Sequence, residues 1–299
     1  MQRKIIYLIN PISGTKGKET LLKMIEQKTQ AFNIPFQILP TNVQGDYSFL
    51  QDKISAEQIT DIVICGGDGT VNQVAKALLN SAVNIGIIPM GSGNGLAFAA
   101  KIPKNPSKAL DIIFATKASY IDSFFINGKF SCMLCGLGFD AQVAHDFAKQ
   151  PKRGLATYMK QTYRNFIKAA PYTFEIINQG TRFTTEAYFI SIANGNQFGN
   201  NFTIAPKASM NDGLLDIVVV KKMSKIKMIV TLVKHILIGE IDYYKNNSFH
   251  KKDILYFQTD RLTINNPLQA PLHIDGDPAI TAEILSIEVI PNAFRLLQP

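Results

Sequence analysis

A run of glycines around a single aspartate is the part of the sequence best suited to chemistry: Cys65-Gly66-Gly67-Asp68-Gly69-Thr70. Glycine has no Cβ, so a backbone of this kind can approach a phosphate closely. The apolar residues before the run predict a strand and those after it a helix, whose first N–H groups attract anions. Asp68 is placed to hold Mg²⁺, which neutralises charge on a transferred phosphoryl group. The alternative is a plain glycine-rich turn in which Asp68 or Thr70 caps the helix.

Two further loops of similar composition follow predicted strands. Gly91-Ser92-Gly93-Asn94-Gly95 comes after the apolar run Ile85–Pro89, and Asn10–Gly14 comes after Ile5–Ile9. In a parallel sheet the carboxyl ends of the strands meet at one edge, where ligands bind. We therefore expect the three loops to form one polyanion site. The Gly-Lys-Ser/Thr of a P-loop is absent, and the loop at Gly66 lacks the dinucleotide G-x-G-x-x-G spacing.

The pattern of apolar residues divides the chain into two parts. Residues 1–120 alternate short apolar runs with helical patterns, which predicts an α/β domain with a doubly wound parallel sheet. Residues 121–299 are mostly strand-like, with turn pairs such as Asn127-Gly128, which predicts a β-rich, antiparallel, sandwich-like domain. Two helices interrupt it, around Leu155–Ala169 and Ser224–Ile238. We expect the site to lie in the cleft between the two domains.

Five motifs, in this order and spacing, resemble the family of diacylglycerol kinases, sphingosine and ceramide kinases and their bacterial relatives. They are Asn10–Gly14, Gly66–Asn72, Gly91–Asn94, Asp212-Gly213-Leu214-Leu215-Asp216 and His273-Ile274-Asp275-Gly276-Asp277. The likeness covers nearly the full chain. It implies a two-domain lipid kinase that transfers the γ-phosphate of ATP to the hydroxyl of diacylglycerol, a sphingoid base or ceramide.

The resemblance also implies roles for particular residues. Asp68 and Asp277 would be catalytic, with Asp277 standing where the family has Glu as the base for the lipid hydroxyl. Asp275 would share this work if the segment is extended, since alternate residues of a strand lie on one face. The side chain of Ser209, that of Asp212 and the backbone carbonyl of Leu214 would bind Mg²⁺. The ATP-binding positions would be Asn10, Thr41, Gly66, Gly67, Asp68, Gly69, Thr70, Val71, Asn72, Gly91, Ser92 and Asn94.

The chain departs from the family pattern at two carboxylates. Gln73 stands where Glu is usual, and Asp277 is one methylene shorter than Glu. Asp275-Gly276 is also a hairpin-turn signal, so a plain turn without catalytic work is the alternative for that motif. Two other functions stay open: a kinase for a soluble substrate, of the NAD kinase type, and a non-catalytic nucleotide-binding regulator.

Composition and charge indicate where the protein acts and which partners it can bind. The net charge is +8, and the three cysteines of this 299-residue chain are typical of a reducing compartment. No stretch approaches the roughly 20 apolar residues of a membrane span, so we expect a cytoplasmic protein. Residues 149–168 hold six basic residues and residues 221–234 five, with no acid in either stretch. Basic helices can dock on anionic lipid, so we expect contact with the inner face of the membrane; the alternative is a solvated face.

The remaining partners are less defined by the sequence. No nucleic-acid reader motif is present, and the aromatic residues are not interleaved with the basic ones, which argues against a nucleic-acid partner. No motif decides between a monomer and a homodimer.

Overall fold

A computed structural model describes residues 2–9, 18–42, 44–115, 117–152, 154–196, 205–238 and 253–299. These residues form two compact units, Met1–Asp122 together with Pro291–Pro299, and Ser123–Ile290. The last nine residues therefore join the first unit, whereas the sequence pattern placed them with the second part of the chain.

The first unit is built on a parallel sheet. Its strands are β1 (Ile5–Ile9), β2 (Phe36–Pro40), β3 (Asp61–Gly66) and β4 (Asn84–Pro89), in the order β2-β1-β3-β4, and the end of β15 (Ile284–Leu297) pairs in parallel with β4. All residues of β1 and β3 are buried. Continuous apolar strands of this kind are typical of parallel sheets that are covered on both faces.

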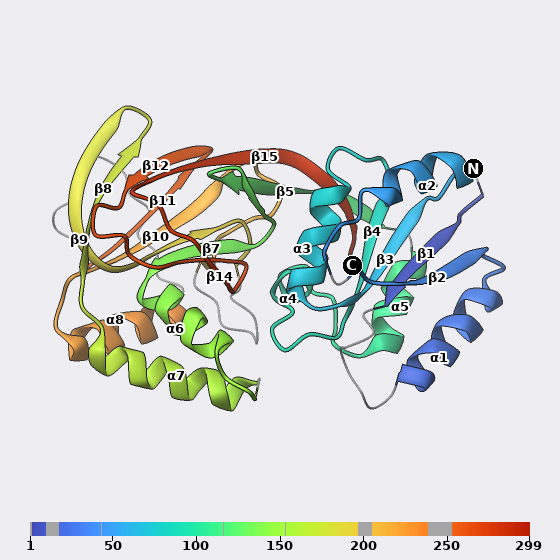
Figure 1. Ribbon diagram of the computed structural model, residues 1–299, viewed down its shortest axis with the longest axis horizontal. Helices are drawn as coiled ribbons and strands as arrows, with labels where there is room; N and C mark the ends of the chain where they lie inside the picture. The colour runs from blue at the N-terminus through green and yellow to red at the C-terminus, as the bar shows by residue number, and fades with distance from the viewer. Residues whose placement is uncertain are drawn as a thin grey trace. The chain divides into compact units, whose positions relative to one another are not determined.

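Helices connect these strands and cover the sheet. They are α1 (Lys18–Ala31), α2 (Phe49–Glu57), α3 (Asp68–Ala77), α4 (Gly95–Ala99) and α5 (Pro106–Ala115). Lys28 of α1 and Asp111 of α5 form an ion pair of 2.6 Å, so these two helices share one face. Figure 1 shows α1 and α5 together below the strands and α2 above them.

A buried ion pair stabilises the amino end of this sheet. Arg3 Nε donates to Asp61 Oδ2 at 2.9 Å, and Asp61 Oδ1 accepts from Asn84 Nδ2 at 3.0 Å. Arg3 also donates to the carbonyl of Ile113 at the far end of α5. These contacts join β3, β4 and α5 on the side opposite the glycine loops.

The second unit is mainly antiparallel. The strands that begin in it are β6 (Lys129–Ser131), β7 (Leu134–Gly138), β8 (Tyr172–Asn178), β9 (Thr181–Ala193), β10 (Leu215–Lys221), β11 (Ile254–Thr259), β12 (Arg261–Asn265), β13 (Leu272–Ile274), β14 (Asp277–Ala279) and the first part of β15. β5 (Ala118–Ile126) enters it from the first unit. The helices are α6 (Phe139–Ala148), α7 (Leu155–Lys168) and α8 (Lys225–Ile238). The long strand β9 pairs with β7, β8 and β10 and so holds a central place.

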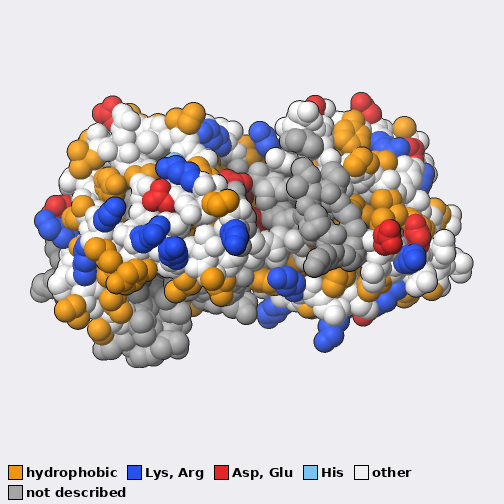
Figure 2. Space-filling model, turned by 60° about the horizontal axis from the view of Figure 1, so that its bottom comes forward, with side chains coloured by type: hydrophobic (Ala, Val, Ile, Leu, Met, Phe, Trp, Pro, Cys, Tyr) orange, Lys and Arg blue, Asp and Glu red, His pale blue; other side chains and the backbone are white. Residues whose placement is uncertain are grey.

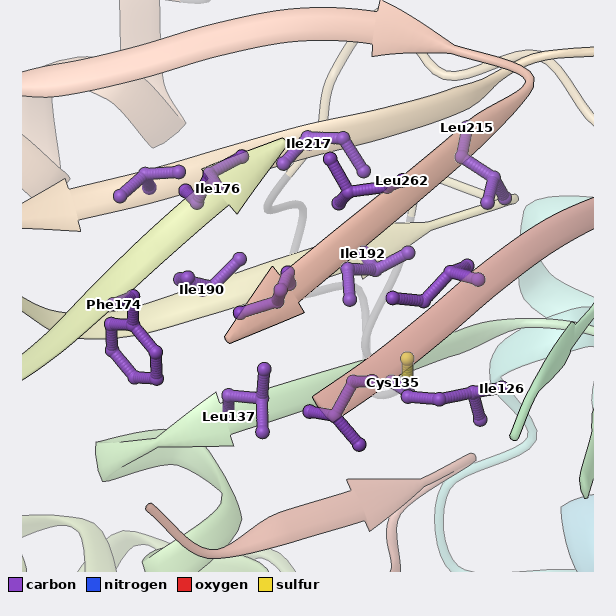
Figure 3. Close-up of a cluster of buried hydrophobic side chains, with 14 of the residues drawn as sticks. Ile126, Cys135, Leu137, Phe174, Ile176, Ile190, Ile192, Leu215, Ile217 and Leu262 are labelled. Carbon is purple, nitrogen blue, oxygen red and sulfur yellow. The ribbon is translucent and has the colours of Figure 1, made fainter. Parts of the chain in front are cut away.

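Alternation of apolar and polar residues directs one face of these strands into a common core. Along β15, Leu285, Ile287 and Val289 are buried, and the residues between them are exposed. Figure 3 shows side chains of several strands meeting in this cluster, among them Leu137, Ile176 and Ile190.

The predicted fold class is confirmed: a parallel α/β unit is followed by an antiparallel, sandwich-like one. The sequence pattern missed α6. This helix begins directly after Gly138, whose φ angle is 94°. It also missed β11 and the short hairpin strands β13 and β14. No helix in the described ranges is both long and apolar enough to cross a bilayer.

Candidate active site

The carboxyl ends of the parallel strands meet at one edge of the first unit, as the sequence predicts. Ile9 pairs with Pro40 and with Cys65, and Gly66 pairs with Pro89, so β1 to β4 end level with one another. Thr41 follows at once, and its N–H donates to the carbonyl of Ile9 at 3.1 Å. The predicted loop from Asn10 to Gly14 lies outside the described residues.

Two glycine loops touch each other at this edge. A Cβ on Gly67 would lie 3.0 Å from Gly91 Cα, and one on Gly91 would lie 2.6 Å from Gly67 Cα. Gly91 has no room for a side chain and Gly67 has very little, because the obstacle is backbone in both cases. Met90 N–H also donates to the carbonyl of Gly66 at 2.9 Å. The loops after β3 and β4 therefore form a single glycine-lined surface.

Asp68 reaches from one loop to the other. It is the first residue of α3, and its Oδ2 lies 2.8 Å from the place that a Cβ on Gly93 would occupy. Gly69 and Thr70 follow in the same turn, where the first N–H groups of a helix have no partner within it. Val71, the next residue, is buried and anchors the helix in the unit. One carboxylate and several helix N–H groups thus face the same glycine surface, an arrangement suited to a metal-bound phosphate.

Asn94 closes the second loop on itself. Its Oδ1 accepts from Gly91 N–H at 2.8 Å, and its Nδ2 donates to the carbonyl of Gly91, also at 2.8 Å. The residue is buried in the left-handed region at a φ of 57°. Its amide therefore shapes the loop, while the neighbouring Ser92 is exposed.

Gln73, which by the resemblance stands where Glu is usual, contacts the loop that follows β2. Its Nε2 lies 2.7 Å from the place that a Cβ on Gly45 would occupy, and Gly45 has a φ of 74°. The loop containing Thr41 is thus joined to α3 through Gln73, and Asn72 lies one residue before this contact on the same helix.

In the second unit, Asp275 and Gly276 form a two-residue turn between β13 and β14. Their φ angles are 49° and 85°, the positive values of a type I′ hairpin. The expectation that Asp275 and Asp277 share a face is wrong, because it assumed an extended segment. Asp275 is buried and Asp277 is exposed.

The Asp275 carboxylate is engaged by the loop that precedes β7. It accepts from Ser131 Oγ at 2.6 Å and from the N–H groups of Cys132, Met133 and Leu134 at 3.2, 3.1 and 3.0 Å. Charge-assisted bonds of this kind are among the stronger ones in proteins. Asp275 thus fixes the hairpin whose next strand begins at Asp277.

A pair that sequence reasoning missed lies beneath this hairpin. Asp140, in the first turn of α6, places Oδ2 3.4 Å from Nε2 of the buried His273, and within the described part of the chain this oxygen has no hydrogen-bond partner. His273 Nδ1 accepts from Gly276 N–H at 3.3 Å. A Cβ on Gly136 would lie 1.9 Å from Asp140 Oδ2, so only glycine fits there. The available signal was Gly136 and Gly138 at the end of an apolar run, as glycines also follow the apolar runs of β3 and β4.

The predicted Mg²⁺ residues lie together in the loop before β10. Ser209 Oγ donates to Asn211 Oδ1 at 2.8 Å, and Asp212 Oδ1 accepts from Leu214 N–H at 3.1 Å. A hydroxyl, a carboxylate and a backbone carbonyl are all oxygen donors, which fits a hard cation such as Mg²⁺. No cluster of three His, Cys, Asp or Glu side chains suited to a metal occurs in the described residues.

The three cysteines, Cys65, Cys132 and Cys135, are buried and form no disulfide with one another. Burial raises the pKa of the Cys65 thiol, and it raises that of Cys135 as well, where the charges of Asp275 and Asp140 add to the effect. Thiols held in the protonated form are poor nucleophiles.

Comparison with known proteins yields matches over both units. Residues 4–126 match the family model described as the diacylglycerol kinase catalytic domain. Residues 134–298 match the model described as the YegS C-terminal NAD kinase beta sandwich-like domain. Together the two matches cover nearly all of the chain.

Individual relatives match over similar lengths. A "probable lipid kinase YegS-like" of Yersinia enterocolitica is 29% identical over 100% of this chain and 98% of its own. The diacylglycerol kinase of Bacillus subtilis is 26% identical over 92% of this chain and 89% of its own. A crystal structure of a diacylglycerol kinase from Bacillus anthracis has the same fold, with a TM-score of 0.75 at 20% identity over 99% of this chain and 97% of that one.

Proposed function

Because the chain belongs to the family of lipid kinases that join a diacylglycerol kinase catalytic domain to a YegS-type C-terminal domain, it is a kinase with an alcohol group as acceptor, and we propose how its residues divide the work. The acceptor in this proposal is the hydroxyl of diacylglycerol, a sphingoid base or ceramide. Diacylglycerol is favoured by the Bacillus subtilis relative, which is a diacylglycerol kinase.

The glycine surface of the first unit holds the triphosphate of ATP. The observation that carries this proposal is the contact between Gly67 and Gly91, which merges two strand-end loops beside the Asp68 carboxylate. Backbone N–H groups of residues 68–70 bind phosphate oxygens, and the loop of Ser92 and Asn94 borders them. Thr41 lies at the same edge. Mg²⁺ held by Asp68 would neutralise charge on the transferred phosphoryl group.

Asp277 takes the proton of the lipid hydroxyl. The oxygen attacks the γ-phosphorus of ATP, the bond to the β-phosphate oxygen breaks, and ADP leaves while Asp277 keeps the proton. Asp277 is exposed at the start of β14, which suits a base that must meet a substrate. Asp275 and His273 position the hairpin rather than react. A cation bound by the side chains of Ser209 and Asp212 and by the backbone carbonyl of Leu214 would stabilise the loop before β10.

Labelled ATP and a total lipid extract test this function. We expect one class of lipid to gain phosphate, identified by mass spectrometry. Asp68→Ala and Asp277→Ala should each lower the rate by at least about a hundredfold while the protein stays folded. Asp111→Ala, on the exposed face of α5, is the control. Full activity of Asp68→Ala would overturn the proposed role of this residue.

A second acceptor deserves a parallel assay, because the matched C-terminal model is described as NAD kinase beta sandwich-like. With NAD in place of lipid we expect no phosphorylated product. Phosphorylation of NAD and not of lipid would replace the lipid by a soluble substrate.

A further inference from the structure

The helix α7 carries its apolar residues on the side that faces water. Leu155, Met159, Tyr163 and Ile167 recur every fourth residue and are 56%, 58%, 68% and 55% exposed. Residues four apart lie on one face of a helix, so these side chains form a continuous stripe along α7. A helix of a water-soluble surface normally shows the opposite arrangement.

The inner side of α7 explains why the stripe is left outside. Gln161 is buried, and Asn165 Nδ2 donates to Asp146 Oδ2 of α6 at 3.1 Å. Two aromatic contacts complete this side: Tyr158 with Phe147 at 5.5 Å and Phe166 with Phe139 at 6.3 Å between ring centroids. α7 is thus attached to the unit by polar and aromatic contacts, and its aliphatic residues are not needed there.

Basic residues border the stripe from Met159 to its carboxyl end. Lys160, Arg164 and Lys168 are exposed and each lies one position after a residue of the stripe. None of the three forms an ion pair with any residue that the structure describes. α7 contains no Asp or Glu. Apolar surface bordered by unpaired cations complements the acyl chains and head groups of an anionic bilayer.

The start of α8 extends the same surface. Lys225 Nζ donates to the carbonyl of Ile167 and lies 6.0 Å from the centre of the Phe166 ring, so α8 begins beside the end of α7. Its exposed residues include Ile226, Ile229 and Val230. Figure 2 shows orange and blue side chains intermixed on this side of the second unit.

We propose that the face formed by Leu155, Met159, Tyr163 and Ile167, with Lys160, Arg164 and Lys168 and the exposed apolar residues of α8, docks on an anionic lipid bilayer. We call it the α7–α8 face. The choice of a bilayer as partner rests on the proposed function, which needs a membrane lipid. α6 packs against α7 and against β13 and β14, and His145 Nε2 lies 2.7 Å from the carbonyl of Leu272. The docking helix and the hairpin that carries Asp277 are therefore attached to one element.

Charge argues against a second copy of the chain as the occupant. In a symmetric dimer the same patch would meet itself. Lys160, Arg164 and Lys168 of one copy would then approach those of the other with no acid between them, and the repulsion of like charges across the interface would oppose association. An anionic surface removes this cost.

The chain contains no tryptophan, so one introduced tryptophan can report the docking by its fluorescence without background. Tyr163→Trp should show a blue shift and protection from an aqueous quencher when vesicles of phosphatidylcholine and phosphatidylglycerol are added. The matched control is Leu268→Trp, at a position 61% exposed in the loop between β12 and β13, whose emission should not change. Equal shifts at both positions, or none at 163, would overturn the proposal.

Co-sedimentation with the same vesicles measures the contribution of the face. The double variant Met159→Glu with Ile167→Glu should bind at least about tenfold more weakly, since apolar burial is lost and two charges repel the lipid. Leu268→Glu with Ile284→Glu changes the charge equally elsewhere on the second unit and should bind within about twofold of the wild type. Lys160→Gln, Arg164→Gln and Lys168→Gln together should abolish the preference for phosphatidylglycerol. Equal losses in the stripe variant and its control would contradict the assignment.

Vesicle binding, turnover on a monomeric lipid and the oligomeric state together separate bilayer docking from the proposed kinase activity and from dimer formation. Vesicle binding is measured without ATP, so it can fail while the kinase works, or succeed if the substrate assignment fails. With a short-chain lipid dissolved as monomers, the Met159→Glu, Ile167→Glu variant should keep wild-type turnover. A dimer that this variant converts to a monomer, with unchanged vesicle binding, would make the face an interface between copies and overturn the proposal.

Discussion

The imidazole of His273 lies between the Asp140 carboxylate, 3.4 Å from its Nε2, and the Gly276 N–H, 3.3 Å from its Nδ1. Because the Gly276 N–H donates to Nδ1, this nitrogen accepts through its lone pair, and the N–H of the ring is on Nε2, the nitrogen that faces Asp140. His273 thus connects α6 to the turn that precedes Asp277.

Two substitutions at His273 separate its two nitrogens. The side-chain oxygen of His273→Asn falls near Nδ1 and can still accept from Gly276, whereas His273→Gln reaches only the Nε2 position. We expect His273→Asn to keep kcat within about threefold and His273→Gln to lose about tenfold or more, because the hairpin loses its support. The KM for ATP should not change in either. Steady-state kinetics check this, and equal losses in both variants would exclude the positioning role.

Gly91→Ala should break the contact between the two glycine loops. The new Cβ would lie 2.6 Å from Gly67 Cα, and backbone cannot move aside as a flexible side chain does. We expect ATP binding, measured by titration calorimetry, to weaken at least about tenfold. Gly128→Ala is the control: it has a positive φ but open space around it, so it should cost about 1 kcal/mol of stability and leave ATP binding intact.

Asp216 should make the stability of the second unit depend on pH. Burial, the largest cause, raises the pKa of this carboxyl from 3.8 to about 6; bonds from Tyr256 and Gln258 lower it and the nearby Asp212 raises it. Between about pH 4 and pH 6 the folded protein keeps a proton that the unfolded chain has released. The free energy of unfolding therefore falls as the pH rises through this window, by up to about 3 kcal/mol.

Urea unfolding of Asp216→Asn from pH 4 to pH 7 tests this. The amide can accept the bond from Tyr256 but does not ionise, so its curve should lack the decline between pH 4 and pH 6. Parallel pH curves for the variant and the wild type would show that Asp216 does not cause the dependence.

The ion pair of Arg3 and Asp61 should matter far more than a surface pair. Asp61 is buried, so Asp61→Ala leaves the Arg3 charge without its partner and should cost about 3 kcal/mol or more. Glu186 pairs with Lys222 at 3.0 Å, but both are about half exposed, and Glu186→Ala should cost less than about 1 kcal/mol. Urea midpoints of the two variants compare them; similar losses would contradict the expected effect of burial.

Local patterns were enough to predict most elements of the first unit. Apolar runs such as Ile5–Ile9 form buried parallel strands, and a glycine loop follows each of β3 and β4. The convergence of those loops followed from the rule that parallel strands end at one edge. The rule does not say which groups each loop side chain binds. Asn94, for example, accepts a hydrogen bond from Gly91 within its own loop.

In the second unit, the environment of the candidate site residues depends on contacts between distant parts of the sequence, which local patterns do not reveal. The turn at Asp275-Gly276 was recognisable, but the burial of Asp275 depends on Ser131, 144 residues away. The pair of Asp140 and His273 likewise depends on β13 lying beside β7, with Ile274 opposite Cys135. Such a pairing is a matter of long-range register, which a single sequence does not display.

The final strand has a consequence for how the protein is made. Arg295 and Leu296 lie beside Asn84 and Ile85 of β4. The strands β1 to β4 are synthesised early, but the outer edge of β4 is covered only after residues 295 and 296 have been made. Until the ribosome has delivered them, the β4 edge has unsatisfied backbone groups. Nascent chains should thus be vulnerable to aggregation and to proteases at this edge, and the first unit should mature only after the second has been translated.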